Sequence, residues 1–115
     1  MRRRHFLLCL FGALPARAAP RRSNGVPDAL AGLLADPAAA RELGKAYLST
    51  APDTATVDMQ ALLRELSNPR TRATPLARHL ARRVQDDFEH GNTALVGGWL
   101  LARTEAAVCA MLALR

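Results

Sequence analysis

The sequence predicts a mainly α-helical fold, a small bundle of four to five helices with a short C-terminal β-hairpin. The length of 115 residues suits one small domain. Half of the residues are hydrophobic and only 4% are aromatic, which is more typical of a helical globular domain than of a disordered chain. Leucine and alanine also recur at helical spacing between proline and glycine breaks.

Residues 1–18 have the features of an export signal. Arg2, Arg3 and Arg4 form a positively charged start, and the apolar run Phe6–Leu14 follows them. As a helix this run would cover roughly 14 Å, about half of a bilayer core, so a membrane-spanning helix is not expected. The residues Ala16 and Ala18 form a small-x-small cleavage site, and we expect cleavage before Ala19.

The signal resembles the bacterial twin-arginine type, which has two arginines, any residue, Phe and Leu. The matching residues are Arg3, Arg4, Phe6 and Leu7. An ordinary secretory signal is the alternative, because no Ser or Thr precedes the arginine pair and Leu8 stands where Lys is common. Either signal predicts export to the periplasm of a bacterium, with membrane contact only through the export machinery.

Most of the positive charge belongs to this segment. The whole chain has a net charge of +6 from 16 basic and 10 acidic residues. Residues 1–18 contain four arginines and no acid, so the remaining 97 residues have 12 basic and 10 acidic residues and a net charge of +2. Such a chain lacks the basic stripe that neutralises phosphates, and nucleic-acid binding is not expected.

The predicted domain spans residues 27–115 and follows a mobile leader at residues 19–26. Leu30, Leu33 and Leu34 predict a first helix from Pro27 to Asp36. Asp36 as N-cap and Pro37 in the first turn begin a second helix, which extends to about Leu48.

The middle of the chain predicts a loop and two further helices. The composition of Ser49–Thr56 indicates a loop. The third helix, Val57–Leu66, has an apolar stripe and ends before Asn68-Pro69. The fourth helix begins at Thr74-Pro75, with Thr74 as its cap, and ends at Gly91. The third-helix stripe consists of Met59, Leu62, Leu63 and Leu66, and the fourth-helix stripe of Leu76, Leu80, Val84 and Phe88.

The opposite face of the fourth helix is polar. His79 lies on this face, and His90 lies at the helix end. The spacing predicts ion pairs between residues 82 and 86 and between residues 83 and 87, each an arginine four positions before an aspartate.

The C-terminal segment predicts a hairpin and a final helix. Gly97 and Gly98 separate two short apolar runs, and two glycines favour a tight hairpin turn. Thr104 would then cap a helix from Glu105 to Leu114, with Glu105 at its positive end. The alternative is an unbroken helix from Trp99, which places Glu105 on an apolar face at a high cost. We therefore favour the hairpin.

No catalytic, cofactor or metal site is predicted. After removal of the signal, His79, His90 and Cys109 are the only His and Cys residues, and they do not have metal-ligand spacing. Cys109 has apolar neighbours and is expected to be buried, the alternative being an intermolecular disulfide. The serines lack a nucleophile motif.

The candidate interaction residues lie around the predicted hairpin. They are Gly97, Gly98, Trp99, Thr104 and Glu105. Trp99 suits a docking anchor, but it also suits the core, because the exported part of the chain has few aromatic residues. Glu105 likewise suits a simple partner for the helix dipole.

The order of features resembles the small exported subunits of bacterial flavin-dependent sugar and alcohol dehydrogenases. The resemblance lies in the twin-arginine-like signal, the helical domain and the tail with Gly91, Thr104, Glu105 and Ala106. It implies a noncatalytic accessory subunit that helps a larger redox enzyme subunit to fold and be exported. Two alternatives remain. One is a freestanding periplasmic small-ligand-binding module. The other is an enzyme that pairs Glu105 with His79 or His90.

Overall fold

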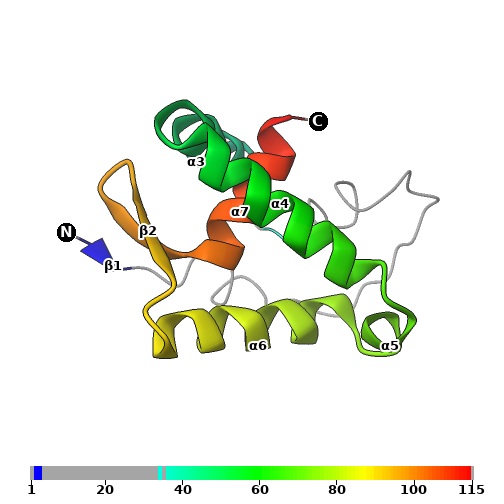
Figure 1. The fold of residues 1–115 in the computed structure, drawn as a ribbon. Helices are drawn as coiled ribbons and strands as arrows, with labels where there is room; N and C mark the ends of the chain where they lie inside the picture. The colour runs from blue at the N-terminus through cyan, green and yellow to red at the C-terminus, as the bar shows by residue number, and fades with distance from the viewer. Residues whose placement is uncertain (1, 4–33, 35, 115) are drawn as a thin grey trace.

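The computed structural model describes residues 2–3, 34 and 36–114 of the chain (Figure 1). The predicted cleavage site, the leader and all of the first predicted helix except Leu34 and Asp36 lie outside the described residues. Of the predicted export signal, only Arg2 and Arg3 are described, and these two form the short strand β1.

The described part of the chain contains five helices and a small sheet, which confirms the predicted fold class. Figure 1 shows α6 below the crossing helices α3 and α4, with α7 between them and the hairpin. In chain order the elements after β1 are α3 (Pro37–Thr50), α4 (Pro52–Leu66), α5 (Pro69–Arg72), α6 (Leu76–Glu89), β2 (Thr93–Val96), β3 (Trp99–Ala102) and α7 (Arg103–Ala113).

The last helix, α7, is the centre of the domain. Every residue from Thr104 to Leu112 is buried, as expected for a helix that is apolar on nearly all sides. Helix α3 packs against it most extensively, and α4 and α6 cover other sides. The core is therefore built around the C-terminal helix.

A glycine in α3 permits the closest helix contact. A Cβ atom on Gly44 would lie 1.9 Å from the backbone oxygen of Cys109 in α7, which is far inside van der Waals distance. Ala40 and Tyr47 flank Gly44 on the buried face of α3. The small side chains allow the two backbones to approach each other, and Gly44 has no room for a substitute.

The predicted start of α3 is confirmed, but the predicted loop at Ser49–Thr56 is wrong. Helix α3 continues to Thr50, and α4 begins at Pro52 after a single intervening residue. Proline suits the first position of a helix, and Asp53 places a negative charge near the positive helix end. The Thr50 and Thr56 hydroxyls donate to backbone oxygens four residues earlier, both at 2.9 Å. Polar composition alone therefore did not distinguish a loop from two helix ends.

The apolar stripe of α4 is confirmed for Met59, Leu62 and Leu66, which are buried. Leu63 is 38% exposed, so it does not belong to the buried stripe. Ala55 extends the buried face toward the start of the helix, in the segment predicted to be a loop.

Helix α6 follows its predicted stripe, with Leu80 and Val84 buried. Thr74 is not its cap. Pro75 occupies the N-cap position, and its backbone oxygen accepts a 3.0 Å hydrogen bond from the N–H of His79. Gly91 follows the helix with a φ of 73°, the left-handed conformation that ends many helices.

The predicted hairpin is confirmed. Strands β2 and β3 are antiparallel, with Val96 opposite Trp99. Gly97 and Gly98 have φ values of 56° and 84°, as a tight primed turn requires. Across the ranges that the structure describes, no helix is both long and apolar enough to cross a membrane.

We predict that Gly44→Ala destabilises the protein by about 3 kcal/mol or more, because the methyl group must push α3 away from α7. Gly91→Ala is the matched control. It has no atom within 4 Å of the added Cβ and should cost roughly 1–2 kcal/mol from its positive φ alone. Denaturant unfolding measures both values. Equal losses would contradict the close helix contact.

Candidate functional site

A group of polar residues surrounds the start of α7, and we call it the polar cluster. Strand β3 leads directly into α7. The residues of the first turn of this helix are largely buried, so the helix begins inside the domain. Backbone N–H groups at a helix start have no partner within the helix and need acceptors from elsewhere. The polar cluster consists of Tyr47, Asp58, Glu65, His79, Arg83, Asp87, Arg103, Thr104 and Glu105.

Glu105 is fully buried and bonds back to the residue before the helix. Its Oε1 accepts a 2.8 Å hydrogen bond from the N–H of Ala102. The hairpin was expected to remove Glu105 from the apolar interior, and this expectation is wrong. The carboxylate is tolerated there because it accepts a backbone hydrogen bond at the positive end of the helix dipole.

Thr104 joins α7 to α6 and does not cap the helix. Ala102 is the N-cap residue, and α7 begins at Arg103. The N–H of Thr104 donates to Asp87 Oδ2 at 2.8 Å. Its Oγ1 accepts from Arg83 Nε at 3.1 Å. Asp87 therefore provides, from another helix, the acceptor that an N-cap side chain usually supplies.

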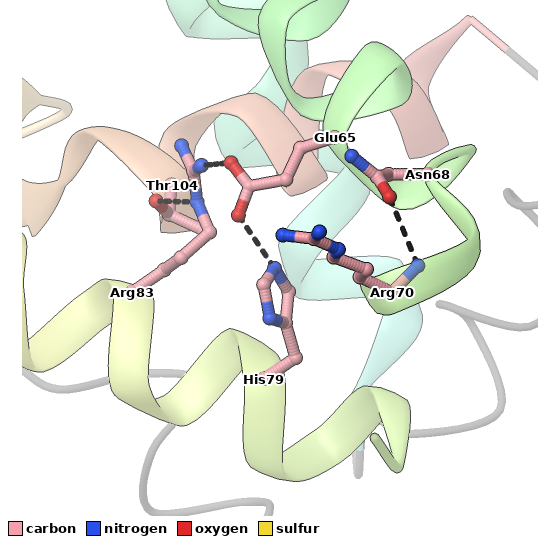
Figure 2. Close-up of polar contacts among 6 residues, drawn as sticks. All are labelled: Glu65, Asn68, Arg70, His79, Arg83 and Thr104. Atoms are coloured by element: carbon pink, nitrogen blue, oxygen red, sulfur yellow. Dashed lines mark hydrogen bonds and ion pairs between the residues drawn. The ribbon is translucent and has the colours of Figure 1, made fainter. Parts of the chain in front are cut away.

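Glu65 connects α4 to α6 through both of its carboxylate oxygens (Figure 2). Oε1 accepts a hydrogen bond from the Arg83 guanidinium. Oε2 lies 2.7 Å from His79 Nε2. His79 was predicted on the polar face of the helix, and its side chain there is only 18% exposed and lies against Glu65 of α4. The predicted pairing of Arg83 with residue 87 is replaced by this contact between helices.

The short helix α5 lies beside this contact. Asn68 caps α5 by accepting a 2.9 Å hydrogen bond from the N–H of Arg70. In Figure 2 the Arg70 side chain extends toward the gap between Glu65 and His79.

Asp58 connects α4 to α3 and to α7. It accepts two hydrogen bonds from Arg103, from Nη2 at 2.9 Å and from Nε at 3.1 Å, in the bidentate geometry that strengthens such pairs. It also accepts a 2.8 Å hydrogen bond from the Tyr47 hydroxyl. The bonds to Asp58 raise the pKa of the Arg103 guanidinium. Burial, together with Asp58, raises the pKa of Tyr47 to about 12.

Cys109 is buried in α7, as predicted. Burial, and to a lesser extent the negative charge of Glu105, raise its pKa to about 12. The thiol therefore stays protonated near neutral pH, and a protonated thiol is a poor nucleophile and metal ligand.

The arrangement suits structural support better than chemistry. Each carboxylate of the polar cluster accepts a hydrogen bond or pairs with a cation from a different part of the fold. Among the residues that the structure describes, no group of three His, Cys, Asp or Glu side chains converges to hold a metal ion. His90 lies apart from the cluster, with Nδ1 2.8 Å from the Asp86 backbone oxygen.

The predicted interaction residues divide into two groups. Gly97 and Gly98 are exposed at the hairpin tip, and Trp99 is partly buried and packs against the core. Thr104 and Glu105 are at most 1% exposed and belong to the interior. Thr104 and Glu105 can therefore affect a partner only through the position of α7.

Sequence reasoning missed Tyr47, Asp58 and Glu65 as members of one cluster. A signal was present for the two acids, because residues seven apart lie on the same side of a helix about two turns away. Asp58 and Glu65 have this spacing and flank buried Leu62. Carboxylates beside an apolar stripe indicate partners on neighbouring helices.

Comparison of the chain with protein-family models, curated proteins and solved structures finds no match.

We predict that Asp87→Ala lowers the free energy of unfolding by about 0.5–2 kcal/mol, because the N–H of buried Thr104 loses its acceptor. Asp86→Ala is the control. Asp86 is the exposed neighbour on the same helix, and its removal should change stability by less than about 0.5 kcal/mol. Urea unfolding of both variants tests this assignment. Equal effects would show that Asp87 does not cap α7.

We predict that the ionisation of Tyr47, the only tyrosine in the chain, opposes folding at high pH. Its pKa is 10.0 in the unfolded chain and about 12 in the folded one. A raised pKa adds stability below pH 10 that is lost as the pH rises toward 12. Ultraviolet titration should show tyrosinate forming near pH 12 in the native protein and near pH 10 in denaturant. Identical midpoints would contradict the Tyr47–Asp58 contact.

Proposed function

We propose that the protein is an exported, noncatalytic accessory subunit that assists the folding, export or assembly of a larger periplasmic redox enzyme. The observation that supports this most is that the polar residues bond the helices to one another. The polar cluster is engaged in bonds between α3, α4, α6 and α7. The hairpin, by contrast, has exposed apolar surface.

The polar cluster supports a role without chemistry of its own. A general base or nucleophile needs a group that changes protonation near the working pH. The Tyr47 hydroxyl and the Cys109 thiol have pKa values near 12. Glu105 is fully buried and bonds to the backbone of Ala102. These groups act as supports for α7.

The hairpin supports a role in protein contact. Leu95 in β2 is 61% exposed and lies opposite Leu100 in β3. Opposite residues of an antiparallel pair lie on the same face, so these two leucines form the outer apolar face of the hairpin. The hairpin tip lies close to α3, because a Cβ on Gly97 would lie 3.7 Å from Leu43 of that helix. Exposed apolar side chains on a supported element are suited to binding another protein.

The signal supports export together with a partner. The twin-arginine route transports folded proteins, so a subunit that bears the signal can carry an enzyme that lacks one. The resemblance to small subunits of flavin-dependent sugar and alcohol dehydrogenases gives the class of enzyme. This domain would bind such an enzyme through the outer hairpin face before export.

The test is co-purification of the tagged protein from its native cell envelope, with mass spectrometry. We expect a redox enzyme subunit without its own signal, in stoichiometric amount. Leu95→Lys should reduce its recovery roughly tenfold, as expected for the loss of an apolar anchor. Val57→Lys is the matched control, because Val57 is equally exposed at 60% but belongs to α4 and not to the hairpin, and its substitution should leave recovery unchanged.

Both variants should keep the wild-type thermal midpoint, since both side chains are exposed. Recovery of a monomeric protein without any enzyme would refute the accessory role and favour a freestanding binding module. Equal recovery with the two variants would show that the hairpin is not the contact surface.

A further inference from the structure

Strand β3 is the middle strand of a three-stranded sheet with the order β1-β3-β2. On one side it pairs with β2 in the hairpin. On the other side it pairs in parallel with β1, with Arg2 opposite Trp99 and Arg3 opposite Leu100. Figure 1 shows β1 beside the hairpin. The beginning of the chain therefore contacts the strand that leads into α7.

This contact is made through the main chain. A strand edge presents N–H and C=O groups that bind an added strand whatever its side chains. The edge of β3 thus has the chemistry of a strand-binding site, and Arg2–Arg3 is its occupant.

The contact is short and therefore reversible. A β1 of only two residues makes few hydrogen bonds, and each shifts an equilibrium by roughly two- to tenfold. Because β1 and β3 belong to one chain, the segment binds at the high effective concentration of a tethered ligand. A weak contact of this kind can form in the folded domain and still be displaced.

We propose that the outer edge of β3 is a strand-binding site that Arg2–Arg3 occupies in the uncleaved chain. The functional part of this inference rests on the proposed export role, because Arg2 and Arg3 belong to the predicted signal. Export machinery must then displace β1 from the folded domain. Cleavage before Ala19 removes β1 and opens the main-chain groups of Trp99 and Leu100 next to the proposed contact face.

The test is amide hydrogen exchange of the purified full chain, produced without export. Arg2→Pro with Arg3→Pro removes the two backbone N–H groups of β1. We expect amide exchange at residues 99 and 100, the β3 residues that pair with β1, to be roughly two- to tenfold faster in this variant. Arg2→Lys with Arg3→Lys is the matched control. It keeps the backbone and the charge, and its exchange should equal that of the wild type.

Amides in α6 should exchange equally in all three proteins, which verifies an intact fold. Unchanged exchange at residues 99 and 100 in the proline variant would overturn the proposal. Faster exchange in the lysine variant would also overturn it, because the arginine side chains would then be responsible. The measurement needs no partner, so its result and that of the co-purification are independent.

Discussion

The structure depends on the burial of a helix start. The N–H groups at the beginning of α7 lie in the interior, where an unpaired polar group is costly. Two carboxylates accept two of these hydrogen bonds, Glu105 from the N–H of Ala102 and Asp87 from the N–H of Thr104, and the Asn92 backbone oxygen accepts one from the N–H of Arg103. Both negative charges also lie at the positive end of the helix dipole. With these acceptors in place, α7 can be the central element of the core.

The same requirement positions the surrounding helices. Asp87 lies on α6, and the contact between Arg83 and Glu65 bonds α6 to α4. Helix α4 is in turn bonded to α3 and to α7 through Asp58. Each acid therefore bonds different elements to one another. The apolar contacts supply most of the driving force for folding. Polar bonds of this kind favour one arrangement of the helices over others with similar apolar burial.

The sequence contained the local features of this fold but not the contacts between helices. The Asp36-Pro37 start and the Gly97-Gly98 turn were predictable, because a cap and a tight turn depend on adjacent residues. The hydrogen bonds that Arg83 donates to Glu65 and that the Thr104 N–H donates to Asp87 depend on how α4, α6 and α7 pack. The spacing of residues along α6 instead favoured a local pair. Gly97 and Gly98 lie exposed at the hairpin tip, where their turn chemistry places them, whereas the interior positions of Thr104 and Glu105 could not be inferred from their spacing.

The hairpin and the polar cluster meet at one residue, Ala102. Ala102 ends β3, and its N–H is the donor to buried Glu105. A change in the pairing of β3 therefore acts on the strand whose last residue anchors the start of α7. Since α7 forms the core with α3, α4 and α6, an ordered hairpin and a packed core require each other. A protein that binds the outer hairpin face would consequently stabilise the whole domain, which is the behaviour that the proposed accessory role requires.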